Sequence, residues 1–128
     1  MAVITTSNPP TVRTPSGYSH GIIVQGATRR LVISGQVGMA PDGSLPATGE
    51  GQIAQAYANL RAVLEANGMS PNNVVKSTVF LTDRALLTAY RSARAAFFAD
   101  QAPASTLLFI SGLADPRFLV EIEAEAAA

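Results

Sequence analysis

Three carboxylates alternate with apolar residues near the end of the chain. The segment "FLVEIEAEA", residues 118–126, places Glu121, Glu123 and Glu125 at every second position. A β-strand points successive side chains to opposite faces, so the carboxylates share one face and the apolar residues share the other. A carboxylate sheltered in a cleft can act as a general base. Two interpretations stay open: the acidic face is plain solvent surface, or part of it lines a site.

Arginines on a predicted helix are the second set of candidates for chemistry. The segment from about residue 84 to 99 carries an apolar stripe that includes Tyr90, with Arg94 inside the stripe and Arg91 at its edge. A guanidinium on an apolar face needs an anion or several carbonyl groups as partners. Arg91 or Arg94 is therefore expected to pair with a glutamate of the last strand or with a ligand carboxylate.

The composition restricts the partners that are expected. Nine Lys and Arg residues balance nine Asp and Glu residues, so no net charge attracts nucleic acid or an anionic membrane. The absence of cysteine and the single histidine argue against a disulfide and against a metal site. Charged residues make up 14% of the chain, below the usual value of about 25%. This shortage predicts that other subunits cover part of the surface.

The length of 128 residues predicts a single domain, with residues 1–16 as an extended N-terminal arm rich in Thr, Pro and Ser. The arm lacks the basic and then apolar order of a secretion signal. The longest uncharged stretch contains Pro, Gly, Ser and Thr and is shorter than the roughly 20 apolar residues of a membrane-spanning helix. We therefore expect a cytoplasmic protein.

The pattern of apolar residues predicts the element order β-β-α-β-α-β-β. Two strands joined by a hairpin at "GATRR" come first, because β-branched apolar residues flank this turn-prone insert. The helix in "EGQIAQAYANLRAVLEANG" has apolar residues at helical spacing and Gly68 as its C-terminal cap. The later elements are expected at about Val74–Leu81 (strand), Arg84–Ala99 (helix), Ser105–Ser111 (strand) and Phe118–Ala126 (strand).

Strands interleaved with two helices predict an α+β fold in which both helices cover one face of a mixed sheet. If the apolar residues of the last strand meet the helices, the three glutamates face the uncovered side. The low content of charge predicts neighbouring subunits on that side, so a cleft between subunits is expected there.

Several segments together resemble the RidA (YjgF) family: "ISGQVGMAPDGSLP", "ANLRAVLEANGMSPNNVVKSTVFLTD", "ARAAFFADQAPAS" and "FLVEIEAEA". Their order and spacing match the family from about Tyr18 to the C-terminus. The resemblance implies a chorismate-mutase-like α+β fold and a homotrimer with a site in each cleft between subunits. It also implies hydrolysis of reactive enamines and imines to carbonyl compounds and ammonia without a cofactor.

The resemblance also implies roles for particular residues. Glu121 matches the glutamate that positions the attacking water and is the predicted catalytic residue. The predicted substrate-binding residues are Tyr18, Ser34, Gly35, Arg91, Ser105 and Leu107.

The chain departs from the family at the position that holds the substrate carboxylate. The sequence reads "PAST" where deaminating members have Pro-Ala-Arg, so Ser105 occupies the arginine position. A serine hydroxyl offers one neutral donor in place of two charge-assisted hydrogen bonds. Arg91 is the preferred replacement for the missing cation, and an atypical substrate range is expected.

Three functions remain open at this point. The first is an enamine or imine deaminase, and the second is a non-catalytic, metabolite-binding or chaperone-like homotrimer. Endoribonuclease activity, also described for the family, is disfavoured because no basic patch with interleaved aromatic residues is present. The expected partners are a small-molecule metabolite and further copies of the chain, with neither nucleic acid nor membrane. His20 is expected to be a surface residue or one with a structural hydrogen bond.

Overall fold

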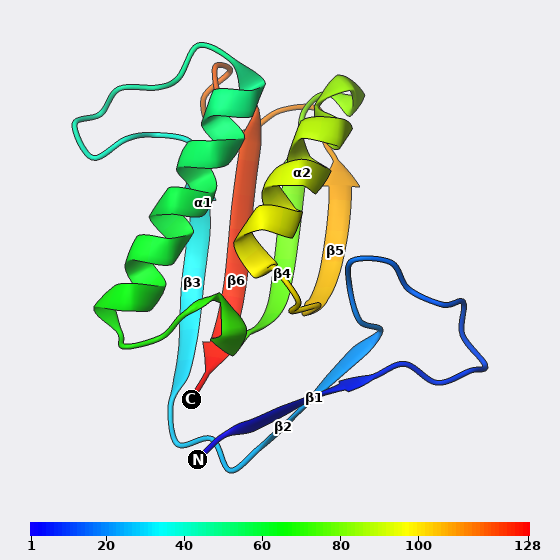
Figure 1. Cartoon of the computed structure of the whole chain (residues 1–128). Helices are drawn as coiled ribbons and strands as arrows, with labels where there is room; N and C mark the ends of the chain where they lie inside the picture. Colours follow the sequence, from blue (N-terminus) through cyan, green and yellow to red (C-terminus); the bar gives the residue numbers. More distant parts are fainter.

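The computed structural model describes residues 1–128 and contains a four-stranded sheet, two long helices and a separate two-stranded ribbon (Figure 1). No helix is both long enough and apolar enough to cross a membrane. The elements are β1 (Val3–Ser7), β2 (Gly21–Gln25), β3 (Arg30–Val37), α1 (Gly49–Ala66), β4 (Val74–Leu81), α2 (Leu87–Phe98), β5 (Ala104–Phe109) and β6 (Val120–Ala127), with short 3-10 helices at Pro71–Asn73 and Arg84–Leu86.

The main sheet has the strand order β3-β6-β4-β5, in which β4 and β5 are parallel and the other pairs are antiparallel. Both helices cover one face of this sheet (Figure 1), which confirms the predicted α+β architecture. On β6 the residues Val120, Ile122 and Ala124 are buried in the core beneath the helices. The glutamates between them therefore lie on the opposite, uncovered face.

Local sequence explains where the helices begin and end. The Thr48 hydroxyl accepts a hydrogen bond from the Gly51 N–H at 3.1 Å and caps α1. Gly68 has a φ of +69° just past α1, as the predicted cap requires. The second predicted helix is divided, because Asp83 caps a 3-10 turn at Arg84–Leu86 before α2 starts.

The predicted hairpin between β2 and β3 is wrong. β2 pairs with β1 instead, so residues 3–7 of the predicted arm form a strand that precedes the predicted element order. The N–H groups of Thr28 and Arg29 both donate to the Ala128 carbonyl at 3.0 Å, and the Ser19 N–H donates to the Pro103 carbonyl at 3.2 Å. These bonds hold the ribbon across one end of the main sheet (Figure 1).

Buried Gln52 ties the start of α1 to the turn before β6. Its Nε2 donates to the carbonyls of Pro46 at 3.2 Å and Arg117 at 3.0 Å, while its Oε1 accepts from the Leu119 N–H at 2.9 Å. Buried polar groups need such partners, because an unsatisfied donor or acceptor is costly in a low-dielectric interior. Gln52 therefore fixes the chain just before Glu121.

Replacing Gln52 with alanine is expected to lower the free energy of unfolding by about 1–3 kcal/mol, because the Leu119 N–H loses its acceptor inside the protein. Urea denaturation followed by circular dichroism measures the change. Gln101→Ala removes the same amide from an exposed loop position and is the matched control, expected within about 0.5 kcal/mol of wild type. Equal stabilities of the two variants would contradict the role assigned to Gln52.

Candidate functional site

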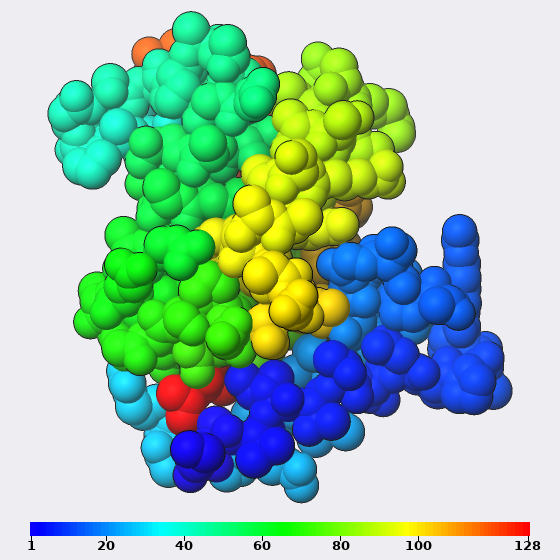
Figure 2. Space-filling model, in the orientation of Figure 1, coloured from blue at the N-terminus to red at the C-terminus, as the bar shows by residue number.

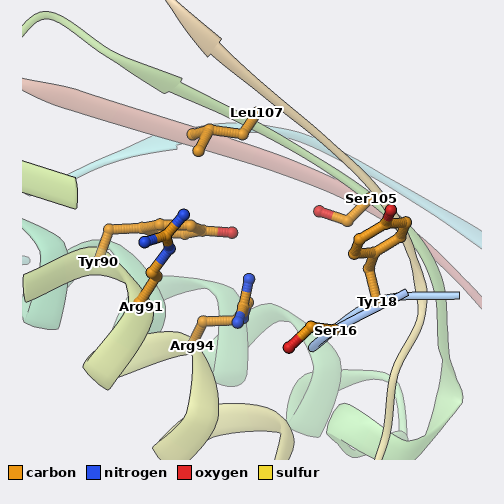
Figure 3. Close-up of a pocket in the computed structure, with 7 residues that line it drawn as sticks. All are labelled: Ser16, Tyr18, Tyr90, Arg91, Arg94, Ser105 and Leu107. Carbon is orange, nitrogen blue, oxygen red and sulfur yellow. The ribbon is translucent and has the colours of Figure 1, made fainter. Parts of the chain in front are cut away.

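A cavity of about 520 Å³ opens between α2, β5 and the loop that leads into β2 (Figure 3). It brings together four of the six predicted substrate-binding residues: Tyr18, Arg91, Ser105 and Leu107. Three further residues complete the lining, namely Ser16, Tyr90 and Arg94. The cavity therefore contains both Arg91, the predicted cation, and Ser105, which occupies the family's arginine position.

Helix α2 contributes both cations of the cavity. Arg91 and Arg94 are three residues apart and so share one side of the helix. Figure 3 shows both guanidinium groups directed into the cavity. Arg94 is half-buried, whereas Arg91 is exposed.

The loop that leads into β2 closes over Arg94. The guanidinium carbon of Arg94 lies 5.7 Å from the centroid of the Tyr90 ring, within cation–π range. The Arg94 guanidinium also lies close to Gly17, where a Cβ atom would push it aside. Gly17 has a φ of +75°, a conformation that favours glycine. Figure 2 shows this N-terminal segment lying against the end of α2.

Neither arginine of the cavity has an acidic partner. The chain forms two ion pairs, Arg30–Glu125 and Arg117–Asp115, each with an N···O distance of 2.8 Å. Pairing of Arg91 or Arg94 with a glutamate of the last strand, one of the predicted alternatives, does not occur within the chain. The cavity combines two free cations with four hydroxyl-bearing side chains, those of Ser16, Tyr18, Tyr90 and Ser105. Such a lining suits an anionic ligand.

Glu121 belongs to a second cluster, together with Ser34 and Gly35. The pairing of β3 with β6 is interrupted between Ile33 and Gln36, and Ser34 and Gly35 form this irregularity. A Cβ atom at Gly35 would lie 2.6 Å from Oε1 of Glu121, so the carboxylate packs directly on the glycine backbone. The three predicted residues therefore meet at one end of β3 and β6.

The two clusters lie on opposite faces of the sheet. Ser105 and Leu107 pair in register with Ser77 and Val79, which are buried on the helix side. Glu121 pairs with Phe80 on the alternate face. Because successive residues of a strand point in opposite directions, one subunit cannot direct Glu121 into its own arginine cavity.

The other glutamates of the last strand have different surroundings. Glu123 is exposed, and Glu125 accepts a hydrogen bond from Nη2 of Arg30 at 2.8 Å. The acidic face is thus partly solvent surface and partly a paired surface. Glu121 alone of the three packs against the irregularity of β3.

Some residues of the cavity were outside the predicted set. The sequence did point to Arg94 and Tyr90, since an arginine inside the apolar stripe of a predicted helix is unusual. The helical pattern alone does not indicate that both side chains reach a cavity. Nothing in the sequence pointed to Ser16, because its position depends on the path of the loop.

His20 has a structural role, as expected: its Nε2 bonds to the Arg13 carbonyl at 2.5 Å, and its ring meets that of Tyr18 edge to face at 5.4 Å.

Tyr57 of α1 is a buried titratable group of the helical layer. Burial raises the pKa of its hydroxyl far above the ordinary value, and the nearby Tyr90 raises this pKa further. Tyr57 therefore stays protonated and is not a base.

No group of three or more His, Asp or Glu side chains is arranged to hold a metal ion.

Comparisons with known proteins agree over most of the chain. Residues 8–128 match the family described as Endoribonuclease L-PSP. Over 125 residues the chain is 35% identical to the 2-iminobutanoate/2-iminopropanoate deaminase of Mus musculus, covering 95% of this chain and 87% of that one. A RutC family protein of Pyrococcus horikoshii is also 35% identical over 125 residues, covering 95% and 94% of the two chains.

Solved structures share the fold. YyfB from Yersinia pestis, a Rid family protein of unknown function, superposes with a TM-score of 0.88 at 33% identity, covering 98% of both chains. RidA from an Antarctic Psychrobacter superposes with a TM-score of 0.74 at 29% identity, again covering 98% of both chains. The chain therefore belongs to the RidA (YjgF) family.

Proposed function

We propose that this protein hydrolyses reactive imines and enamines to carbonyl compounds and ammonia, in clefts formed between copies of the chain. The observation that carries the proposal is the packing of the Glu121 carboxylate on Gly35, at an opening of the β3–β6 ladder on the uncovered face. Relatives named 2-iminobutanoate/2-iminopropanoate deaminase support the reaction class.

Glu121 acts as the general base in this proposal. It removes a proton from water while the water oxygen bonds to the carbon of the protonated imine, which gives a neutral carbinolamine. The proton held by Glu121 then passes to the amino nitrogen, the C–N bond breaks to release ammonia, and the hydroxyl group gives its proton to solvent as the carbonyl forms. One water is consumed for each carbonyl compound and ammonia formed. No external oxidant or reductant is required.

The irregularity of β3 supplies polar groups beside this base. Backbone groups at a bulge are released from regular pairing in the ladder and can bind a ligand. Ser34 and Gly35 occupy this position, next to the Glu121 carboxylate. They are the proposed contacts for the substrate on the side of Glu121, and the missing side chain of Gly35 leaves space for both the carboxylate and the ligand.

The substrate carboxylate binds to α2 in this proposal. Ser105 provides no charge, whereas the unpaired guanidinium groups of Arg91 and Arg94 enter the same cavity as its hydroxyl. An arginine on α2 approaches a ligand from a different direction than an arginine on β5 would. The proposed substrate range therefore differs from that of members with the Pro-Ala-Arg motif.

A homotrimer brings the two clusters together in this proposal. The uncovered face of the sheet exposes Val32 by 65% and Leu108 by 43%, and such apolar surface favours burial against another subunit. A neighbouring copy that covers this face can present its arginine cavity to Glu121. Each cleft then takes its base from one copy and its cations from another.

A binding protein without turnover is the second candidate. The observation that favours it is Ser105, since loss of the β5 arginine can leave a cleft that binds metabolites without orienting them for hydrolysis. This candidate needs the same cavity but no function for Glu121. The effect of removing the Glu121 charge therefore separates the two candidates.

Glu121→Gln is expected to lower kcat/KM for imine hydrolysis by at least about 100-fold, because the amide cannot accept a proton from water. Imines are generated in situ by an amino-acid oxidase, and their decay is followed with a trapping reagent. Glu123→Gln makes the same change on the same face of β6, at an exposed position, and is expected to keep the wild-type rate. Background rates for the wild type, or equal rates for wild type and Glu121→Gln, would contradict the proposal.

A further inference from the structure

We infer that the arginine cavity selects imino acids that carry a second carboxylate on their side chain. This inference rests on the proposed function and names its substrate class. Two guanidinium groups enter one cavity, and neither has an acidic partner in the chain. A substrate with one carboxylate pairs with only one of these cations, whereas a dicarboxylate pairs with both.

The two cations are held differently, which suits two separate carboxylates. Arg94 is half-buried, within cation–π range of the Tyr90 ring and close to Gly17. Arg91 is exposed and free of such packing, one helical turn away on α2. We assign the first carboxylate to the half-buried guanidinium of Arg94 and the second to the exposed guanidinium of Arg91.

The rest of the lining also favours a polar substituent over an alkyl chain. Leu107 is the single aliphatic side chain of the cavity, and the remaining lining consists of hydroxyl-bearing residues and the two arginines. An alkyl side chain would desolvate these polar groups without replacing their hydrogen bonds, whereas a carboxylate accepts from them. The volume of about 520 Å³ leaves room for a four-carbon or five-carbon diacid.

The test compares two four-carbon imines. Iminosuccinate is generated from aspartate by an aspartate oxidase, and 2-iminobutanoate is generated from 2-aminobutanoate by a general amino-acid oxidase. Wild-type protein is expected to hydrolyse iminosuccinate with a kcat/KM at least about tenfold higher than that for 2-iminobutanoate. A tenfold ratio corresponds to the free energy of about one hydrogen bond to a charged group. Arg91→Met and Arg94→Met are each expected to bring this ratio toward one. Arg61→Met, at an exposed position of α1 outside the cavity, is the control that keeps the ratio.

Binding of stable analogues separates this inference from the proposed function. Calorimetry with succinate, butanoate and inorganic phosphate requires no turnover. Preferential binding of succinate that is lost in Arg91→Met and Arg94→Met, without hydrolysis of either imine, would support the inference and refute the proposed function. Hydrolysis of both imines with equal kcat/KM would overturn the inference and leave the function standing. Phosphate binding as tight as succinate binding would also overturn it.

A different observation supports a second inference, about the β1–β2 ribbon. β3 is an edge strand of the main sheet, so its outer edge is unpaired along residues 30–37. β2 pairs with β1 alone, so its other edge is unpaired as well. Unpaired edges of this kind are sites for pairing with another chain. Residues 26–29 connect β2 to β3 and have the length of a hairpin loop. The two strands that they join nevertheless lie in different sheets.

Exposed apolar residues concentrate on these strands. Four of the seven exposed large apolar side chains lie on β1, β2 and β3, namely Val3, Ile23, Val24 and Val32. The bond from the Ser19 N–H to the Pro103 carbonyl holds the start of the ribbon beside β5, the edge strand opposite β3. The structure assigns the open edge of β3 to β2 of a second copy, in an exchange of strands between subunits.

Disulfide cross-linking tests the exchange, since the chain has no cysteine of its own. An antiparallel β2–β3 pair closed over residues 26–29 places Ile23 opposite Val32, at a separation that a disulfide can bridge. Ile23→Cys and Val32→Cys change exposed positions, so folding is expected to be retained. The double variant is expected to give covalent dimers and larger species on oxidation, and a refolded mixture of the two single variants is expected to give the mixed dimer. An internal disulfide in a monomeric double variant, or no disulfide at all, would overturn the exchange.

Discussion

The alternation of side chains along β6 is the constraint on which the rest of the structure depends. Val120, Ile122 and Ala124 must face the helices to form the core, and this requirement fixes Glu121 on the other face. The same rule places Ser105 and Leu107 of β5 on the helix side. Glu121 and the arginine cavity of one chain are therefore separated by the sheet itself. The proposed function joins them through the assembly of several copies.

The sequence predicted the main sheet and helices well because their patterns are local. Val74–Leu81 was predicted with the bounds that β4 has, and Gly68 adopts the cap conformation expected of it. The predicted hairpin at "GATRR" is wrong because β2 pairs with β1 instead, and because the Ser19 N–H bonds to the Pro103 carbonyl, a position far away in the sequence. No period in the sequence carries that information. Tertiary hydrogen bonding overrode a plausible local turn.

The candidate site divides in the same way. Glu121, Ser34 and Gly35 were predicted from the family resemblance, and the structure brings them into one cluster. The convergence of Arg91 and Arg94 on one cavity depends on the docking of α2 beside β5 and on the loop at Gly17, which helical spacing alone cannot give. In the proposed site, these two cations of α2 take the place of the arginine that the Pro-Ala-Arg motif puts on β5.

Subunit complementation tests the central claim, that each site combines Glu121 of one copy with the arginines of another. Glu121→Gln protein and Arg91→Met/Arg94→Met protein are unfolded, mixed in equal amounts and refolded, and imine hydrolysis is compared with that of each parent treated alone. Random assembly leaves about a quarter of the clefts with both parts intact, so the mixture is predicted to recover about a quarter of the wild-type activity. A mixture no more active than its inactive parents would contradict the claim, because a site contained within one chain is broken in every subunit.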